Sequence, residues 1–436
     1  MSFSKSLCQV GHGLKKPWLN RLFSIQVSNN QAASATSSQD AHKPKTAILM
    51  LNMGGPTHID QVSEYLHRIM TDRDMIQLPV QGKLGPWIAR RRTPEVQKKY
   101  TEIGGGSPIL KWTKLQGEAM AKKLNTVCPE FGPLKPYVGF RYADPLTEET
   151  LEQIEQDGVE RVVIFSQYPQ YSCATSGSSL NSIYTHYSKK GNPTNISWSL
   201  IDRWTSSPNE SICFIDTLIL FCHFRGNPTN ISWSLIDRWS THPLLLKAFA
   251  SRITDELKQF PADVQKDVII LFSAHSLPLK AVNRGDPYPS EVGATVQGVM
   301  QELNYCNPYH LVWQSKVGPL PWLGPFTDDA LRGYVKQGKK NFLLVPIAFV
   351  NEHIETLHEM DIEYCHDLGK ELKVDNIRRA AAPNDHPLFI DALVDIVSSH
   401  LRGQSRISPK FLNRCPHCVN PKCGHAKKWF AKLCAV

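Results

Sequence analysis

The sequence AILMLNMGGP, residues 47–56, decides the fold class. Its apolar run from Ala47 to Met53 ends at two glycines and a proline. A short apolar run closed by turn residues predicts a strand that is buried on both faces, as in a parallel sheet. Five further runs of this kind follow, at residues 137–142, 161–166, 267–273, 310–314 and 342–349.

Helical patterns lie between these runs, for example at residues 146–156 and 289–303. Buried strands that alternate with helices predict parallel sheets connected by right-handed crossovers. We therefore expect an α/β protein with two doubly wound halves, at residues 43–204 and 240–403. Ligands of such folds bind beyond the carboxyl ends of the strands. Several distinctive residues fall there: Met53, Arg141, Tyr142, His275 and the segment after Phe349.

Length and composition limit the classes of protein to which this chain can belong. A chain of 436 residues suits two domains, and 41% hydrophobic residues with 20% charged residues argue against disorder. The net charge of +9 comes without a long basic stripe, so nucleic acid is a poor candidate partner. No apolar run reaches the roughly 18 residues that a membrane-spanning helix needs.

The first 42 residues differ from the rest. Between Met1 and Ala41 the only acid is Asp40, and basic residues, serines and apolar residues are interspersed. This composition predicts a mitochondrial transit peptide at residues 1–42; a disordered tail without targeting function is the alternative. In the reducing mitochondrial matrix, clustered cysteines more often hold metal than form disulfides.

One segment is repeated without change. GNPTNISWSLIDRW occurs at residues 191–204 and again at 226–239. Solenoid repeats diverge and occur in larger numbers, so this is no repeat architecture. We interpret residues 205–239, or an equivalent 35-residue block, as an anomalous insertion that arose by recent duplication or from a faulty gene model. An additional hairpin that contacts a membrane is the functional alternative.

The C-terminal residues 404–436 contain a metal-binding pattern. Cys415, Cys418 and Cys423 have the spacing C-x2-C-x4-C in a basic segment. Zinc would need a fourth ligand, which His417 or His425 could supply. A 2Fe-2S cluster would need a fourth thiolate.

A set of carboxylates follows the run at 342–349. In NEHIETLHEMDIEY the acids recur every three or four residues, a spacing that puts them on one face of a helix. A solvated surface is the usual explanation, but this stripe follows a strand end, where carboxylates could bind a divalent ion or relay protons. The acids are Glu352, Glu355, Glu359 and Glu363.

Ten motifs, taken in order, resemble those of ferrochelatases. They are NMGGP (52–56), RRTP (91–94), GGGSPI (104–109), GFRY (139–142), QYPQYSC (167–173), FSAHSLP (272–278), NRGDPY (283–288), WQSKVGP (313–319), PWLGP (321–325) and HIETL (353–357). The resemblance runs from about residue 45 to the C-terminus and breaks at the 35-residue block. It implies two Rossmann-like chelatase domains with a cysteine-rich extension, and a lyase-class enzyme that inserts ferrous iron into protoporphyrin IX to form haem.

The resemblance also implies site residues. The inner active-site residues are His275, as proton acceptor or metal-handling residue, with His353 and Glu355. His242 and Asp395 match further functional positions, and Glu352, Glu359 and Glu363 would form an iron or proton path. The family usually has Asp at the position of Glu352. Residues implied to bind the substrate are Met53, Arg92, Tyr100, Ser107, Arg141, Tyr142, Tyr168, Trp322 and Phe349.

The resemblance supplies Cys173 as the fourth ligand of a 2Fe-2S cluster, with Cys415, Cys418 and Cys423. It further implies a homodimer on the matrix side of the inner mitochondrial membrane. An apolar lip that includes Ile69, Met75 and Trp87, beside Arg90 to Arg92, suits a peripheral membrane contact; an ordinary solvated helix is the alternative. A porphyrin or metal carrier without catalysis, and an inactive product of the duplication, are the rival interpretations.

Overall fold

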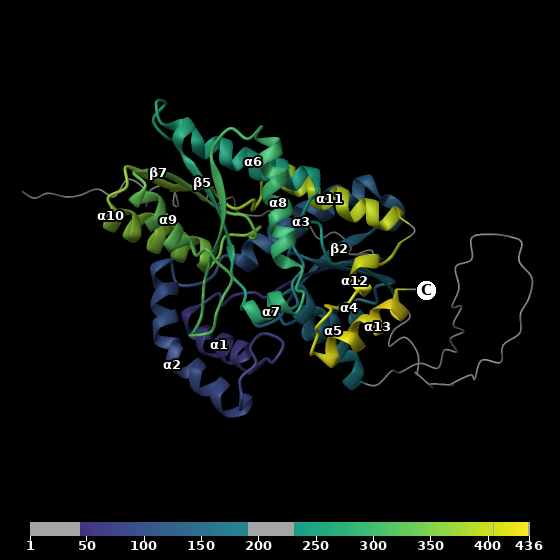
Figure 1. Ribbon diagram of the computed structural model, residues 1–436. Helices are drawn as coiled ribbons and strands as arrows, with labels where there is room; N and C mark the ends of the chain where they lie inside the picture. Colours follow the sequence, from purple (N-terminus) through teal and green to yellow (C-terminus); the bar gives the residue numbers. More distant parts are fainter. Residues whose placement is uncertain (1–43, 191–230, 404, 435–436) are drawn as a thin grey trace, which may run out of the picture. The chain divides into compact units, whose positions relative to one another are not determined.

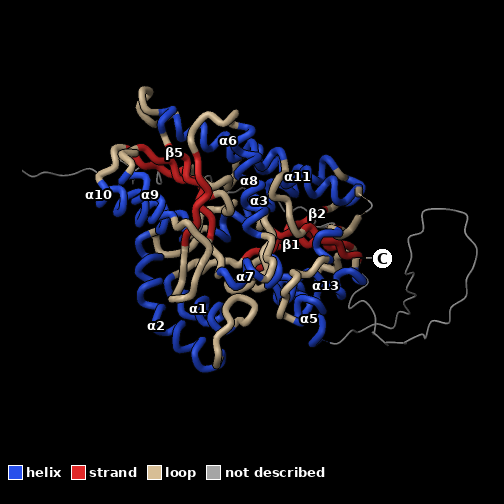
Figure 2. Tube along the Cα trace, viewed as in Figure 1, coloured by secondary structure: helices blue, strands red, loops and turns tan. Residues whose placement is uncertain are grey.

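The computed structural model describes residues 44–190, 231–403 and 405–434. Contacts divide the chain into two units, residues 1–42 and 43–436, and the strands and helices described belong to the second. Its described strands form two four-stranded sheets, both entirely parallel (Figures 1 and 2). The predicted fold class is therefore confirmed.

The first sheet has the order β2-β1-β3-β4. Its strands are β1 (Thr46–Asn52), β2 (Leu134–Phe140), β3 (Arg161–Ser166) and β4 (Ser232–Ile236). The second sheet repeats this topology as β6-β5-β7-β8. Its strands are β5 (Ile269–His275), β6 (Tyr309–Gln314), β7 (Asn341–Pro346) and β8 (Asn376–Arg379). In each half the strand order reverses beside the first strand, where doubly wound folds bind their ligands.

The helices connect and cover these strands. In the first half they are α1 (Val62–Thr71), α2 (Gln81–Glu102), α3 (Ile109–Val127), α4 (Thr147–Gln156) and α5 (Ser176–Lys190). In the second half they are α6 (Pro243–Leu257), α7 (Leu279–Asn283), α8 (Tyr288–Glu302), α9 (Thr327–Lys336), a π-helix η5 (Glu355–Leu368), α10 (Gly369–Leu372) and α11 (Pro387–Arg402). The C-terminal segment adds α12 (Pro409–Leu412) and α13 (Pro421–Leu433). Short 3-10 turns lie at Ile59–Gln61, Pro129–Phe131 and Gln265–Asp267.

Alternate residues of each buried strand face two different clusters. In β1, Ile48 and Met50 belong to a cluster with residues of α3, whereas Leu49 and Leu51 belong to a cluster with residues of α4, α5 and α13. The first cluster continues into the second half, where it takes in residues of α6, α8 and α11. The two halves therefore share one hydrophobic core and are joined by more than a linker.

The second copy of the repeated segment lies inside the first sheet. Its residues Ser232–Ile236 form β4 and pair with β3, and the Trp239 indole N–H donates to the Ser166 carbonyl at 2.8 Å. This copy therefore takes part in the fold, and the insertion of residues 205–239, or of an equivalent 35-residue block, stays a prediction. Residues 191–230, which include the first copy, lie outside the described residues.

Glycines allow two sequence motifs to pack closely around β1. A Cβ atom added at Gly55 would lie 2.8 Å from the Ser107 side chain. The Ser107 amide donates to the Pro56 carbonyl at 2.7 Å, so the NMGGP and GGGSPI motifs touch at the carboxyl end of β1. No helix among the described residues is long and apolar enough to cross a membrane.

Candidate functional site

The last residue of β5 and the first residue of the π-helix form the centre of the candidate site. His275 Nδ1 and Glu355 Oε2 lie 2.8 Å apart, and the His275 side chain remains 38% exposed. His353 lies on the other side of the same carboxylate, with Nε2 3.9 Å from Glu355 Oε1. The structure thus brings together the three residues that the resemblance assigned to the inner active site.

The shared carboxylate gives the two histidines different proton affinities. Burial alone would lower the pKa of His275, but the charge and hydrogen bond of Glu355 outweigh it and raise that pKa. Burial lowers the pKa of His353, and the more distant Glu355 and Glu352 compensate only in part. For Glu355, burial is outweighed by the two histidines and by the hydrogen bonds from His275 and Ser315, so its pKa falls to about 2. One imidazole therefore favours the charged form and the other the neutral form.

Two aromatic rings flank the histidines. The Trp322 ring is 6.4 Å from the His275 ring in an edge-on arrangement, and the Phe349 ring is 4.6 Å from the His353 ring. Trp322 comes from the segment between β6 and α9, and Phe349 follows β7. Both residues were predicted as walls of the substrate site, and both lie against its histidines.

The π-helix begins at Glu355, and its next glutamate, Glu359, lies beside the same serine, Ser315. Ser315 Oγ donates to Glu355 Oε2 at 3.1 Å and also donates to Glu359, and the Ser315 amide donates to Glu359 Oε1 at 2.7 Å. Burial and the charge of Glu355 raise the pKa of Glu359. Turns in a π-helix are wider than in an α-helix and frequently occur at functional sites. Acids four residues apart therefore stay aligned along this helix.

Glu352 does not belong to this stripe, contrary to the prediction. It precedes the π-helix, and its carboxylate is bound by Arg379 Nη1 at 2.9 Å and by the Ala382 amide at 2.9 Å. The prediction assumed an α-helix through residue 352, and the helix begins three residues later. The Glu352 carboxylate is thus held on the side of β8.

Glu363, the last acid of the stripe, connects the π-helix to α2. Its carboxylate lies 2.8 Å from Lys99 Nζ and 3.2 Å from His358 Nδ1. His358 Nε2 in turn lies 2.6 Å from Glu102 Oε2 at the end of α2. We call Lys99, Glu102, His358 and Glu363 the α2 tether. It fixes α2 against the helix that carries Glu355.

Three tyrosines lie near enough to Glu355 for its charge to affect their hydroxyl groups. Burial raises the pKa of Tyr65, Tyr100 and Tyr168, and the charge of Glu355 raises it further. The Tyr168 hydroxyl accepts from the Met53 amide at 2.8 Å and donates to Asn52 Oδ1 at 3.0 Å, which places it at the carboxyl end of β1. Met53 and Tyr168, which come from different motifs, thus meet at the carboxyl end of β1, whereas Tyr100 is buried on α2. Ser107 is buried beside Gly55, and Arg92 is partly exposed on α2.

Arg141 and Tyr142 share one acidic partner. Arg141 Nη2 lies 2.6 Å from Asp72 Oδ2, and the Tyr142 hydroxyl donates to the same oxygen at 2.9 Å. Asp72 follows α1, so both residues anchor the end of that helix. The structure thus gives these two predicted ligand residues a protein partner.

His242 and Asp395 also meet. The atoms His242 Nε2 and Asp395 Oδ2 are 2.9 Å apart, between the start of α6 and the middle of α11. The His242 side chain is mostly buried and the Asp395 side chain is 58% exposed. They form a separate histidine–carboxylate pair on helices that pack against α3 and α8.

The four predicted cluster ligands lie around the C-terminal segment. Cys173 Sγ, in the loop before α5, is 3.5 Å from Cys415 Sγ. The hydrogen bond from Cys173 lowers the pKa of Cys415 to about 7, and burial raises the pKa of Cys423 to about 11, with a contribution from Cys418 and Cys415. All four are free thiols. Within residues 44–190, 231–403 and 405–434, however, no three metal-binding side chains are already gathered around one point.

Two kinds of metal site could use this donor set. A zinc site takes four ligands around one ion, so the three C-terminal thiols would need one further donor. A binuclear cluster takes four thiolates and spreads them over two metals. Two cations lie close to these thiols. The charge of Lys427 lowers the pKa of Cys423 and so opposes the effect of burial, and Arg414 forms a hydrogen bond with Cys418.

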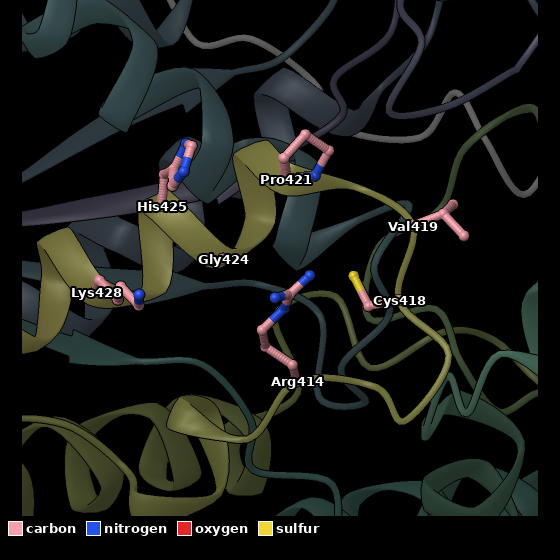
Figure 3. Close-up of a pocket in the computed structure, with 7 residues that line it drawn as sticks. All are labelled: Arg414, Cys418, Val419, Pro421, Gly424, His425 and Lys428. Carbon is pink, nitrogen blue, oxygen red and sulfur yellow. The ribbon is translucent and has the colours of Figure 1, made fainter.

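Arg414 lies over a glycine beside these thiols. A Cβ atom added at Gly424 would lie 3.2 Å from the Arg414 guanidinium, a tight contact that would require the arginine side chain to shift slightly. Figure 3 shows the Arg414 side chain between Gly424 of α13 and the sulfur of Cys418. These residues line a hollow of about 240 Å³ together with Val419, Pro421, His425 and Lys428.

The C-terminal segment is docked by the NRGDPY motif. The His417 amide donates to the Arg284 carbonyl at 3.2 Å, and Gly285, at φ +95°, leaves room for Pro416. Asp286 Oδ2 accepts from the Cys173 amide at 2.9 Å. One loop of the second half therefore holds both Cys173 and the tail that carries the other three cysteines.

Sequence reasoning missed several residues of the site. Ser315 lies within the quoted WQSKVGP motif, directly after β6, and its place at a strand end was the available signal. Tyr65 and His358 gave no comparable signal, because their roles depend on contacts between distant segments. Arg379 was hidden in a strand of four residues, which is too short to be recognised from its pattern.

Sequence comparisons show the family to which the chain belongs. A sequence model described as Ferrochelatase matches residues 45–219 and 220–401. "Ferrochelatase, mitochondrial" of Drosophila melanogaster is 63% identical over 403 residues, which are 92% of this chain and 96% of the relative. The human protein of the same name is 51% identical over 400 residues, 92% of this chain and 86% of the relative. Among solved structures, "SirB from Bacillus subtilis with Fe3+" aligns with a TM-score of 0.42 and 11% identity, over 83% of this chain and 98% of that one. The chain belongs to the ferrochelatase family.

Proposed function

We propose that this chain inserts ferrous iron into protoporphyrin IX to form protohaem, the terminal step of haem synthesis, as a lyase-class metal chelatase. The observation that carries the proposal is the Glu355 carboxylate between His275 and His353, at 2.8 and 3.9 Å, where β5 ends and the π-helix begins. Family membership supports the reaction, and this geometry supports its assignment to these residues.

Metal insertion requires two pyrrole N–H protons to leave the ring. A neutral histidine is suited to accept such a proton near pH 7. His353 is held neutral by burial. Glu355 stabilises the imidazolium that His275 becomes on accepting a proton, which makes neutral His275 the stronger base. Glu359, whose pKa is raised, and Glu363 would continue the path for protons or for incoming iron. His242 and Asp395 would serve as a further metal or proton pair away from this centre.

The porphyrin requires apolar walls and a few anchors for its two propionates. We propose that Trp322, Phe349, Met53 and Tyr168 line its ring, which the ring contacts to His275 and His353 support. The proposed propionate contacts are Arg92, Tyr100 and Ser107, with Arg141 and Tyr142 nearby.

We also propose that Cys173, Cys415, Cys418 and Cys423 hold a 2Fe-2S cluster, which when bound would add covalent links between the tail and the loop before α5. The 3.5 Å approach of Cys173 and Cys415 and the docking of the tail on Arg284 and Asp286 support this arrangement. The distinguishing measurement is the visible absorption of the purified protein with iron and sulfide analysis. Cys173→Ser should abolish both, and Cys306→Ser, at an exposed free thiol, should not. Stoichiometric zinc without sulfide would refute the cluster.

Residues 1–42 are proposed to direct the chain to the mitochondrial matrix, where it would bind the inner membrane peripherally as a homodimer. On α2, Trp87 is 56% exposed and Arg91 lies 5.8 Å from its ring, a combination suited to an anionic lipid surface. Co-sedimentation with anionic vesicles, compared between the chain and Trp87→Ala, tests the contact. Sedimentation velocity tests the dimer.

Iron insertion by the purified protein tests the main proposal. His275→Ala should lower kcat by about 10²–10⁴-fold, the usual contribution of a positioned acid–base group, with little change in porphyrin affinity. His310→Ala removes an exposed histidine of β6 and should leave kcat unchanged. Porphyrin binding without metalloporphyrin formation by the unaltered protein would instead favour the carrier interpretation.

A further inference from the structure

Arg379, the last residue of β8, is a buried cation with two acidic partners. Its side chain is only 9% exposed. Nε and Nη2 lie 2.7 and 2.8 Å from the two carboxylate oxygens of Asp361, and Nη1 lies 2.9 Å from Glu352 Oε1. The guanidinium thus uses one edge for a two-pronged contact and its remaining nitrogen for a second acid, a geometry that only arginine provides.

The two acids flank the residues of the candidate site along the chain. Glu352 directly precedes His353, and Asp361 lies within the π-helix that begins at Glu355. The guanidinium therefore links the segment that enters the helix to a later turn of the same helix. His353 and Glu355 lie between the two linked points.

The segment after β8 holds the same acid from a second direction. The Ala382 amide donates to Glu352 Oε1 at 2.9 Å, and Asn384 Oδ1 accepts from the Glu352 amide at 2.9 Å. Asn384 adopts a left-handed conformation at φ +48°, and its own amide donates to the Val350 carbonyl at 2.9 Å. Residues 350 and 352 are thereby fixed to the segment that directly follows the strand of Arg379.

We propose that Arg379 is a positioning residue for metal insertion: by bridging Glu352 and Asp361 it fixes His353 and Glu355 against His275. This inference rests on the proposed function and adds to it a residue that does not itself touch the three reacting groups. It also gives Glu352 a role in place of the iron or proton path predicted from the sequence. Displacements of about 1 Å at a catalytic group can cost about 100-fold in rate, so a residue outside the site can control kcat.

Arg379→Lys is the direct test. Lysine keeps the charge but has a single nitrogen, which cannot reach both carboxylates in the observed geometry. We expect kcat for iron insertion to fall by about 10- to 100-fold, with the KM for protoporphyrin within about twofold of the parent. Arg378→Lys is the matched control, because Arg378 pairs with Glu256 on α6 at 2.5 Å. This variant should leave both kcat and the KM unchanged. Asp361→Asn releases the other end of the bridge and should reproduce the loss of kcat if Arg379→Lys does not fold.

Backbone hydrogen exchange of residues 350–362 supplies a readout that is independent of activity. Exchange there should become faster in Arg379→Lys and Asp361→Asn, while exchange of β1 stays unchanged. Unchanged kcat with unchanged exchange in these variants would overturn the proposal, as would equal losses of kcat and porphyrin affinity. If the unaltered protein inserts no iron, the proposed function fails, and the exchange result still decides whether Arg379 fixes this segment.

Discussion

At the scale of single residues, one carboxylate organises the candidate site. Glu355 raises the pKa of His275, while burial keeps the pKa of the more distant His353 low. The difference comes from geometry, since His275 is in hydrogen-bond contact with Glu355 and His353 is 3.9 Å away. In the proposed reaction, His353, whose pKa is lowered, would be the neutral acceptor of a ring proton, and Glu355 would stabilise the proton on His275.

The stability of the protein should report this coupling. The lowered pKa of Glu355, about 2, contributes stability above its unfolded value, near 4.3, and the contribution is lost as the pH falls towards 2. The raised pKa of His275 contributes stability below its unfolded value, near 6.5, and the contribution is lost as the pH rises through the folded value. Glu355→Gln should therefore lower the free energy of unfolding most between about pH 4.3 and 6.5. The expected loss is on the order of 1–2 kcal/mol, because solvent screens the partly exposed His275 ring.

Urea unfolding of the parent and of Glu355→Gln across pH 3–9 measures this difference. Glu371→Gln is a suitable control, because Glu371 pairs with Arg332 on the exposed surface. A difference between the parent and Glu355→Gln that stays constant with pH would contradict the coupling.

The sequence predicted some of these residues and missed others for a physical reason. His275, His353 and Glu355 were assigned because they lie in recognisable motifs at predicted strand ends. Ser315 and Arg379 act through hydrogen bonds to residues 40 and 27 positions away, respectively. Such contacts exist only once β5, β6, β7 and β8 have assembled, so no local pattern reveals them.

At the scale of secondary structure, the π-helix differs from the expected α-helix. The spacing of the acids fits both helix types over a few residues, so the sequence could not separate them. The wide helix keeps Glu355, Glu359 and Glu363 in a row and leaves Glu352 outside it. Six of the eight described strands were predicted to within a few residues, because buried apolar runs are a strong signal; β4 lies in the repeated segment, which was interpreted as part of an insertion. β8 was missed because it has only four residues, two of them arginines.

The α2 tether connects this helix to the proposed propionate contacts on α2. Because Arg92 and Tyr100 lie on α2, loss of the tether should weaken porphyrin binding more than the chemical step. We expect Lys99→Met combined with His358→Gln to raise the KM for protoporphyrin several-fold, with kcat within about twofold. Steady-state kinetics with varied porphyrin measures both constants.

Lys98→Met provides the control for the tether, since Lys98 is exposed and its nearest acid atom is 3.9 Å away. The Lys98 variant should leave the KM unchanged. If kcat falls and the KM stays constant in the Lys99→Met/His358→Gln variant, the tether acts on the reacting groups and not on the porphyrin contacts.

At the scale of the whole molecule, the duplicated segment raises the question of which copy belongs to the fold. The second copy forms β4, buries Trp233 completely, and connects to α8 in the other half, since Arg238 pairs with both Asp237 and Glu291. The sequence could not choose between two identical copies, because local pattern is the same in both. The choice depends on the chain that follows: residues 237–242 lead directly from β4 to α6.

Because the copies are identical, removal of residues 191–225 or of residues 205–239 produces the same polypeptide. The deletion shortens the chain between Lys190 and Ser232 from 41 residues to 6 and leaves every residue of β4 represented. Loop-closure entropy grows with the logarithm of length, so the shorter chain should be more stable by about 2 kcal/mol. Iron insertion should be unchanged, because the site lies on β5, the π-helix and the ends of β1 and β3. Urea unfolding and steady-state kinetics of the two proteins measure both effects.

Matched tryptophans show whether the second copy alone occupies the sheet. Trp233→Ala removes a fully buried side chain of β4 and should destabilise the full-length protein by about 3–5 kcal/mol. Trp198→Ala alters the equivalent residue of the first copy and should change the unfolding free energy by less than about 0.5 kcal/mol. Equal losses from both substitutions would mean that both copies contribute to the folded core. Trp233→Ala could instead destabilise the full-length protein only slightly and the shortened protein by the full value of about 3–5 kcal/mol. That result would mean that the first copy replaces the second in β4.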